Sequence, residues 1–179
     1  MLNDALGSVG RQTSPAAETL VEVDAGGTGA GATRNRALRR VQTPWVAFLD
    51  DDDWLMPGHL SVLALAQAYS GADVVWPWFE VSGGTDPFPQ NKGRQWDPEN
   101  PHVFPITTLV RTDVLRDVGW FREHGEIDDP NDPERRVAGE DWDLWLRLSA
   151  AGARFHHVPI TTWVWRHHAT NTSGMPGRA

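Results

Sequence analysis

The most constraining feature of this sequence is an apolar segment that runs directly into four consecutive acids. Residues 45–49 are all apolar, and residues 50–53 are all aspartate. A short, wholly apolar run that ends at a turn is typical of a strand buried on both faces. The four carboxylates are therefore expected at the carboxyl end of a buried strand, where their mutual repulsion needs a compensating charge.

Helical and extended patterns alternate along the rest of the chain. We expect helices over residues 2–9, 32–41, 57–70, 112–118 and 140–151, and strands over 19–24, 45–49, 73–79, 155–158 and 161–165. Strands that alternate with helices predict an α/β fold with a largely parallel sheet flanked by helices. Ligands of such sheets bind beyond the carboxyl ends of the strands. Asp24 and the aspartate run each follow a strand, so we expect them to share one cleft.

Length and composition fit one domain that spans residues 1–179. The apolar fraction is 40%, and the formal net charge of −8 argues against nucleic acid as a partner, because nucleic-acid-binding domains carry basic faces. The chain has no cysteine, and no apolar run approaches the roughly 20 residues of a membrane span. The first residues show no secretory signal pattern. The sequence therefore predicts a cytoplasmic protein, and it is compatible with a homo-oligomer.

A divalent cation would relieve the repulsion within the aspartate run. Mg²⁺ and Mn²⁺ prefer carboxylate oxygens, and such an ion also bridges to the oxygens of a diphosphate. The alternative is an acidic turn that is solvated by water. The buried strand before the run and Pro57, which suits the first turn of a helix, favour the cation site.

Two segments near the aspartate run carry further candidate ligands. Asp24 ends the expected strand over 19–24, where it is placed either to hydrogen-bond a nucleotide base or to cap a turn. The glycine-rich residues 26–31 allow the backbone to approach an anion at the start of the next helix. Arg34 lies in the first turn of that helix, where it would hold a phosphate or a base, or lie at the surface.

The C-terminal half offers a second acidic pair and two adjacent histidines. Glu140 and Asp141 begin the expected helix over 140–151. Acids in this position stabilise the helix dipole, and the alternative role is that of a general base for an incoming hydroxyl. His167 and His168 follow the last expected strand, and neutral imidazole is a common metal ligand.

Taken in order, these segments resemble glycosyltransferase family 2, whose members have the GT-A nucleotide-sugar fold. The aspartate run and the Glu-Asp helix, at this separation and in this order, make the combination specific. The resemblance covers nearly the whole chain, through LGSVGRQT (6–13), VD (23–24), TRNRA (33–37), FLDDDD (48–53), VGWF (118–121), GEDWDLWLRL (139–148) and WRHH (165–168).

The resemblance implies a donor site at the N-terminal half of the chain. Asp24 would contact the nucleotide base, and Arg34 would help to hold the nucleotide. Residues 50–52 would form the Asp-x-Asp motif of the family. Within it, Asp51 would lie near the ribose or the diphosphate, Asp50 would also help to bind the nucleotide sugar, and Asp52 would be the direct ligand of Mn²⁺ or Mg²⁺.

The resemblance also implies a reaction. Asp141 would be the general base that deprotonates the acceptor hydroxyl. Glu140 would help to bind the nucleotide sugar, and His168 would lie near the diphosphate and the metal. The activity would be an inverting transfer of a sugar from a nucleotide diphosphate, with a UDP-sugar expected as the donor. The acceptor, which would be a carbohydrate, a lipid or a protein, is not readable from the sequence.

The chain departs from the family pattern at its start. Members of the family usually begin with a strand that lies in the middle of the sheet, and the present sequence begins to match at the helix after it. The resemblance therefore describes an N-terminally shortened GT-A fold, in which sheet edges would be exposed. The family's second aspartate after the next strand is also replaced, by Ala25.

Two other functions fit part of the sequence. One is a non-catalytic protein that binds a nucleotide sugar with the same residues. The other is a dinucleotide-binding oxidoreductase domain, because Gly27, Gly29 and Ala32 open a helix after a strand, and Asp50 follows about 20 residues later. The second alternative assigns no role to the remaining aspartates or to the Glu-Asp helix.

Tryptophans and one long loop are candidates for the acceptor side. The long loop over 123–138 is of the kind that closes over substrates. Five tryptophans are expected to divide between the core and the acceptor region, namely Trp76, Trp78, Trp120, Trp142 and Trp145.

Overall fold

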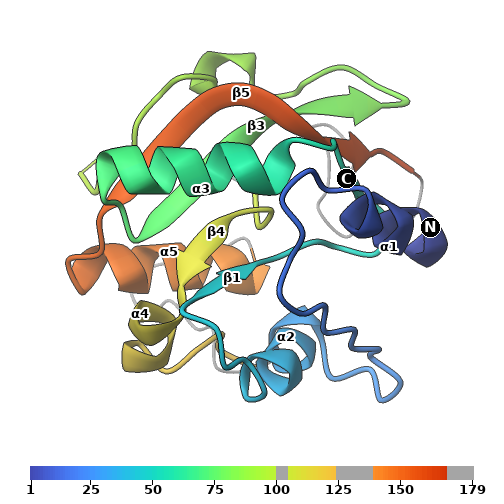
Figure 1. The fold of residues 1–179 in the computed structure, drawn as a ribbon. Helices are drawn as coiled ribbons and strands as arrows, with labels where there is room; N and C mark the ends of the chain where they lie inside the picture. Colours follow the sequence, from blue (N-terminus) through green and yellow to red (C-terminus); the bar gives the residue numbers. More distant parts are fainter. Residues whose placement is uncertain (100–104, 124–138, 169–179) are drawn as a thin grey trace.

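The computed structural model describes residues 1–99, 105–123 and 139–168 (Figure 1). The loop that was expected to close over substrates therefore lies almost entirely outside the described residues. Within them, the helices are α1 (Leu2–Gly10), α2 (Ala30–Leu38), α3 (His59–Ser70), α4 (Thr112–Asp117), α5 (Gly139–Ala150) and the 3₁₀ turn η1 (Pro89–Asn91). The strands are β1 (Trp45–Ala47), β2 (Trp54–Leu55), β3 (Val74–Ser82), β4 (Leu109–Arg111) and β5 (Phe155–Arg166).

The strands form one mixed sheet in the order β1-β4-β3-β5-β2. Only β3 and β5 pair in parallel, whereas β1 with β4, β3 with β4, and β2 with β5 pair antiparallel. The expectation of a largely parallel sheet was therefore wrong in this detail. The cause is two strands of three and two residues, β4 and β2, which are too short to show a periodic pattern in the sequence.

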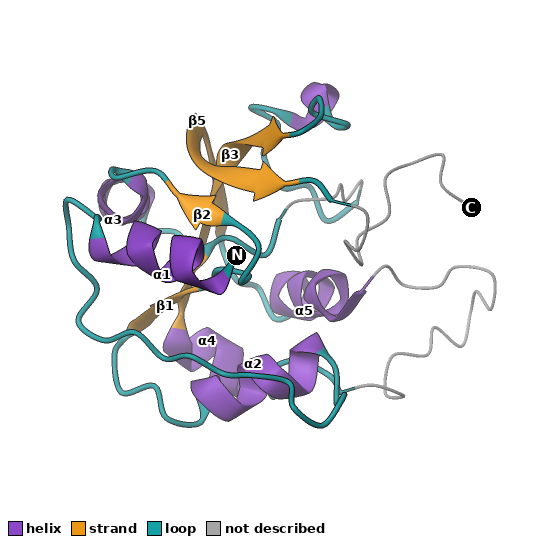
Figure 2. Cartoon of the chain, turned by 90° about the vertical axis from the view of Figure 1, so that its right-hand side faces the viewer, coloured by secondary structure: helices purple, strands orange, loops and turns teal. Residues whose placement is uncertain are grey.

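The segment over 19–24 is not a strand, contrary to expectation. Its residues are mostly exposed, and they belong to the long loop that joins α1 to α2 (Figure 2). A β-strand requires a neighbour to accept and donate its backbone hydrogen bonds. Within the described part of the chain, no strand pairs with residues 19–24, and the other edge of β1 is not used for pairing, since β1 pairs with β4 alone.

The last strand is longer than expected and replaces two predicted strands. β5 curves along the whole length of β3 (Figure 1), and the two pair from Val74 with Phe155 to Ser82 with Arg166. The register shifts between Pro77 and Trp78 and again between Trp78 and Phe79, where the partners pass from Val158 to Thr161 and then to Trp163. Bulges absorb the skipped residues of β5, so the strand continues where the sequence suggested a break.

The core lies between the sheet and the helices α4 and α5. Trp76 and Trp145 are fully buried there, together with Leu144 and Leu148. Trp78 is buried in a second cluster with Phe79 and Trp163. Three of the five candidate acceptor tryptophans are thus core residues, whereas Trp120 and Trp142 are partly buried and pack against the core.

No helix within residues 1–99, 105–123 and 139–168 is long and apolar enough to cross a membrane.

Candidate functional site

The aspartate run turns sharply after β1, and three of its four side chains, those of Asp50, Asp52 and Asp53, reach different partners. The backbone N–H of Asp53 donates to the carbonyl of Asp50 at 3.3 Å, which closes the turn. Asp50 accepts a hydrogen bond from Arg34 at 2.7 Å, and Asp51 is exposed. Asp52 lies 2.9 Å from the Nε2 of His168. The run is therefore divided between two sides of the site.

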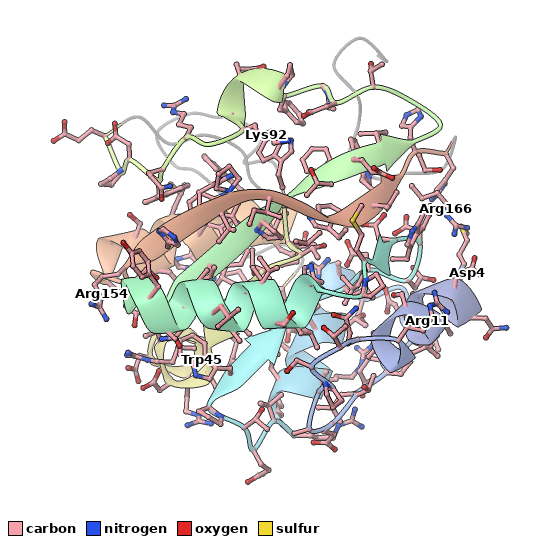
Figure 3. All side chains as sticks on the ribbon, turned by 45° about the horizontal axis from the view of Figure 1, so that its top comes forward. Asp4, Arg11, Trp45, Lys92, Arg154 and Arg166 are labelled. Carbon is pink, nitrogen blue, oxygen red and sulfur yellow. The ribbon has the colours of Figure 1, made fainter. Side chains whose placement is uncertain are left out.

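Asp53 has a structural role. Its side chain is buried, and its Oδ1 accepts a hydrogen bond of 2.8 Å from the backbone N–H of Arg166 at the end of β5. Burial is the main reason that the pKa of the Asp53 carboxyl is raised to about 8. The hydrogen bond from Arg166 acts against this shift, and the neighbouring Asp52 and Asp50 act in favour of it. The side chain of Arg166 reaches Asp4 on α1 at 3.0 Å (Figure 3). This connection fixes the aspartate turn against α1 and β5.

Arg34 joins the aspartate turn to the start of α5. Its Nη2 donates to Asp50, and its Nη1 donates to the Oε1 of Glu140. The guanidinium also lies over the ring of Phe121, 5.4 Å from the centroid. The two carboxylates raise the pKa of Arg34 against the effect of burial, so the side chain is a permanent cation. The expected surface alternative for Arg34 was wrong, because only 15% of its side chain is exposed.

Asn35 and Gly31 hold α2 close to the segments that carry the site. The side chain of Asn35 is buried, donates to the carbonyl of Phe121 at 2.9 Å and accepts from its N–H at 3.1 Å. A Cβ at Gly31 would lie 2.6 Å from the carbonyl oxygen of Arg122 and 3.4 Å from Glu140. The sequence analysis assigned this packing role to neither residue, although Asn35 lies in the TRNRA motif and Gly31 in the glycine-rich segment.

Asp141 is held at the first turn of α5, next to Glu140. Its carboxyl has a pKa that is raised to about 6, mainly by burial and next by the negative charge of Glu140. The positive charge of Arg34 and a hydrogen bond from the backbone N–H of Trp142, at 2.7 Å, act in the opposite direction. A carboxylate with a pKa close to neutrality is a better proton acceptor than an ordinary one and is still mostly ionised at pH 7.

Asp24 shapes the turn that precedes α2. Its two carboxylate oxygens accept hydrogen bonds from the backbone N–H and hydroxyl of Thr28 and from the N–H of Gly29, each at 2.8 Å. These bonds lower the pKa of Asp24. Of the two roles considered from the sequence, the structure shows turn capping, and the contact with a base stays a prediction.

A groove of about 930 Å³ brings several of these residues together. It runs between α1, α2, α3 and the face of β1, and it is lined largely by apolar side chains. Its polar lining includes Asp24, Arg34, Asp50 and Asp51, so Asp24 shares this groove with the first two aspartates of the run. The expectation of one cleft for the whole run holds only in part, because Asp52 pairs with His168 and Asp53 is buried against β5. Glu140 is connected to these groove residues by its ion pair with Arg34. Asp52 and His168 form a separate pair, apart from this ion-pair network.

The sequence model described as Glycosyl transferase family 2 matches residues 20–119, more than half of the chain. A pre-mycofactocin glycosyltransferase of Mycobacterium tuberculosis is 30% identical to the chain, over 74% of the chain and 29% of that protein. The chain belongs to glycosyl transferase family 2.

Solved structures show which fold the chain has. S. aureus TarS, residues 1–349, in complex with UDP-GlcNAc superposes with a TM-score of 0.74 at 16% identity, over 95% of this chain and 56% of that chain. The same TarS fragment with UDP gives a TM-score of 0.70 at 17% identity, over 93% and 56% of the two chains. These likenesses establish the GT-A fold. The chain spans little more than half of the TarS fragment and less than a third of the curated relative.

Membership of this family removes the dinucleotide-binding alternative. The glycine-rich segment precedes α2, but the strand that this alternative requires before it is not formed by residues 19–24. In addition, Asp50, which would have bound a ribose in that interpretation, is paired with Arg34.

The pair of Asp52 and His168 has the chemistry expected of a partial metal site. Within the described residues, no group of three or more His, Cys, Asp or Glu side chains is arranged to hold a metal ion. Magnesium-type ions in proteins are often held by one or two carboxylates and complete their coordination with substrate phosphates. One carboxylate and one imidazole 2.9 Å apart therefore fit an ion that arrives with a diphosphate.

Proposed function

We propose that this chain transfers a sugar from a nucleotide-diphosphate donor to an acceptor hydroxyl, with inversion of configuration. The observation that carries the proposal is the ion-pair bridge of Arg34, which joins the donor-side Asp50 to the helix start that bears Asp141. A donor group and a general base must lie on one rigid frame for such a reaction. Family membership supports the same conclusion.

The donor side of the site comprises Asp24, Asp50, Asp51, Arg34 and Glu140. Four of these residues line the groove, and Glu140 is bound to one of them. A UDP-sugar is the proposed donor, because the TarS structures with the same fold are complexes with UDP-GlcNAc and UDP. The apolar lining of the groove suits the flat face of a base, and its acids suit the hydroxyls of a ribose.

Asp52 and His168 are the proposed ligands of Mn²⁺ or Mg²⁺. When bound, such an ion neutralises the charge that develops on the departing nucleoside diphosphate. The two side chains already lie together at 2.9 Å. His168 would bind the ion through an imidazole nitrogen, a common metal ligand in proteins.

Asp141 is the proposed general base. Its carboxylate would accept the proton of the acceptor hydroxyl as the hydroxyl oxygen attacks the anomeric carbon. Burial and the neighbouring Glu140 bring its pKa to about 6. At pH 7 about nine tenths of the population would be ionised, and the conjugate acid would still release its proton readily.

A thermal-shift screen with UDP-, GDP- and dTDP-sugars, with and without Mn²⁺, tests the donor. We expect stabilisation by a UDP-sugar that depends on Mn²⁺. A radiolabelled-sugar assay that monitors hydrolysis and transfer then tests the reaction. Asp141→Asn should keep the metal-dependent thermal shift and lose transfer. Transfer at the wild-type rate by this variant would show that Asp141 is not the base.

The same assays distinguish a non-catalytic binding protein from an enzyme. Such a protein would show the Mn²⁺-dependent shift with a UDP-sugar, but it would neither hydrolyse nor transfer it with any acceptor tested. A shift with a nucleotide sugar that does not change in the Asp52→Ala variant would instead remove Asp52 from the proposed metal site.

A further inference from the structure

Arg34 links two carboxylates that lie far apart in the sequence. Both ends of its guanidinium are used, one by Asp50 at 2.7 Å and the other by Glu140. The side chain of Arg34 is 15% exposed, and that of Glu140 is 25% exposed. Because the planar guanidinium fixes the direction of each bond, an arginine in this position defines the geometry of both partners.

The surroundings of Arg34 restrict its movement. Phe121 lies under the guanidinium, and the next residue on α2, Asn35, binds both backbone groups of Phe121. On the same side of α2, Gly31 permits the close approach of Glu140. The aspartate turn, the Phe121 segment and the start of α5 are therefore held together through two adjacent residues of α2.

We propose that Arg34 is a positioning residue, which acts through Asp50 and Glu140 to fix Asp141 relative to the donor. This inference rests on the proposed function for the role of Asp141. It differs from a direct contact between Arg34 and the nucleotide, because both guanidinium ends are already occupied by protein carboxylates.

The charges around Asp141 support this role. The groups that act on it are Glu140 on its own helix, Arg34 from α2 and Asp50 from the aspartate turn. Of these, Arg34 is the cation, and it lowers the pKa of Asp141 while burial and the two acids raise it. Without Arg34, the carboxyl of Asp141 would lie among acids alone, and it would hold its proton at a higher pH.

The decisive experiment compares Arg34→Met with Arg34→Lys in the pH dependence of sugar transfer. For Arg34→Met we expect kcat to fall by about 100-fold, the loss typical of a misplaced catalytic group. The acidic limb of the pH–rate profile should also move upward by about one pH unit, because a nearby cation lowers a carboxyl pKa by about that amount or more. Arg34→Lys keeps the charge, so it should lose kcat but keep the acidic limb in place.

The matched control is Arg154→Met. Arg154 is an exposed arginine on the opposite side of the molecule from Asp4 and Arg166 (Figure 3). Its partner Asp73 would keep a second ion pair in the variant, with Arg111 at 2.7 Å. This variant should leave kcat and the pH profile unchanged. If Arg34→Met weakens UDP binding but changes neither kcat nor the acidic limb, Arg34 is a direct donor contact and the inference is wrong.

Two further measurements address a variant that does not fold and a chain whose turnover cannot be measured. If Arg34→Met does not fold, Glu140→Gln tests the same linkage from the other side, because removal of this acid should move the acidic limb downward. A ¹³C NMR titration of the Asp141 carboxyl, assigned with the Asp141→Asn variant, needs no turnover. A wild-type chain that transfers no sugar would contradict the proposed function, whereas an Asp141 pKa that is unchanged in Arg34→Met or Glu140→Gln would contradict the positioning role.

Discussion

Replacement of Asp141 by asparagine removes a charge that the folded chain disfavours and keeps the shape of the side chain. Burial, reinforced by Glu140, raises the pKa of Asp141 from 3.8 to about 6. The folded state therefore binds this proton more tightly than the unfolded chain does. Stability must fall as the pH rises from 3.8 to about 6, and the loss is complete above that range.

The magnitude follows from the two pKa values. A tenfold change in proton affinity corresponds to about 1.4 kcal/mol, so the ionised Asp141 destabilises the fold by at most about 3 kcal/mol at pH 7.5. The backbone N–H of Trp142 donates a hydrogen bond of 2.7 Å to Asp141 in the wild-type chain. The amide oxygen of asparagine can still accept this bond. We therefore expect Asp141→Asn to raise the free energy of unfolding by about 1–3 kcal/mol at pH 7.5.

Urea denaturation at pH 7.5 and at pH 4 measures this difference. At pH 4 most Asp141 side chains are already neutral in the folded chain, so the gain should largely disappear. Asp113→Asn is a suitable control, because Asp113 is an exposed acid in the first turn of α4 and its pKa is lowered by Arg111. This control should show no gain at pH 7.5. A loss of stability in Asp141→Asn, or an equal gain at both pH values, would refute the electrostatic argument.

Three further predictions follow from the same structure. Transfer by the wild-type chain should fall about tenfold between pH 7 and pH 5, since a base with a pKa of about 6 is protonated there; a rate that stays flat to pH 5 would remove Asp141 as the base. Asp52→Ala should abolish the Mn²⁺-dependent part of the thermal shift with a UDP-sugar, whereas Asp97→Ala, an exposed acid outside the site, should keep it. Gly31→Ala should lower the free energy of unfolding by about 1–3 kcal/mol in urea, because its Cβ would meet the carbonyl oxygen of Arg122 at 2.6 Å; Gly10→Ala, which meets nothing within 4 Å, is the control and should not be destabilised.

The family and the positions of the acidic segments could be predicted from the chain itself. The apolar run before four aspartates is a local pattern, and it does mark a strand that leads the acids to a groove. The expectation that this strand is buried on both faces was wrong, because β1 is a partly exposed strand of three residues at the edge of the sheet. The helix over 140–151 was predicted for a similar reason, since Leu144 and Leu148 fall on one face and are buried in the core. Such patterns are legible because they depend on neighbours in the sequence.

The sheet directions could not be predicted in the same way. β4 and β2 contain three and two residues, and their existence depends on partners that are distant in the sequence. For the same reason the residues over 19–24 have the composition of a strand but remain unpaired in the described chain. Strand formation needs a neighbour, and propensity alone does not provide one.

The sequence by itself determined that this chain carries the acids of a family 2 glycosyltransferase, at the end of a strand and at the start of a helix. Only the tertiary structure decided how the acids divide. Asp53 is buried against β5, Asp52 pairs with His168, and Asp50 meets Glu140 through Arg34. The physical reason is that a carboxylate's role is set by burial and by the charges beside it, and these come from segments up to about a hundred residues away.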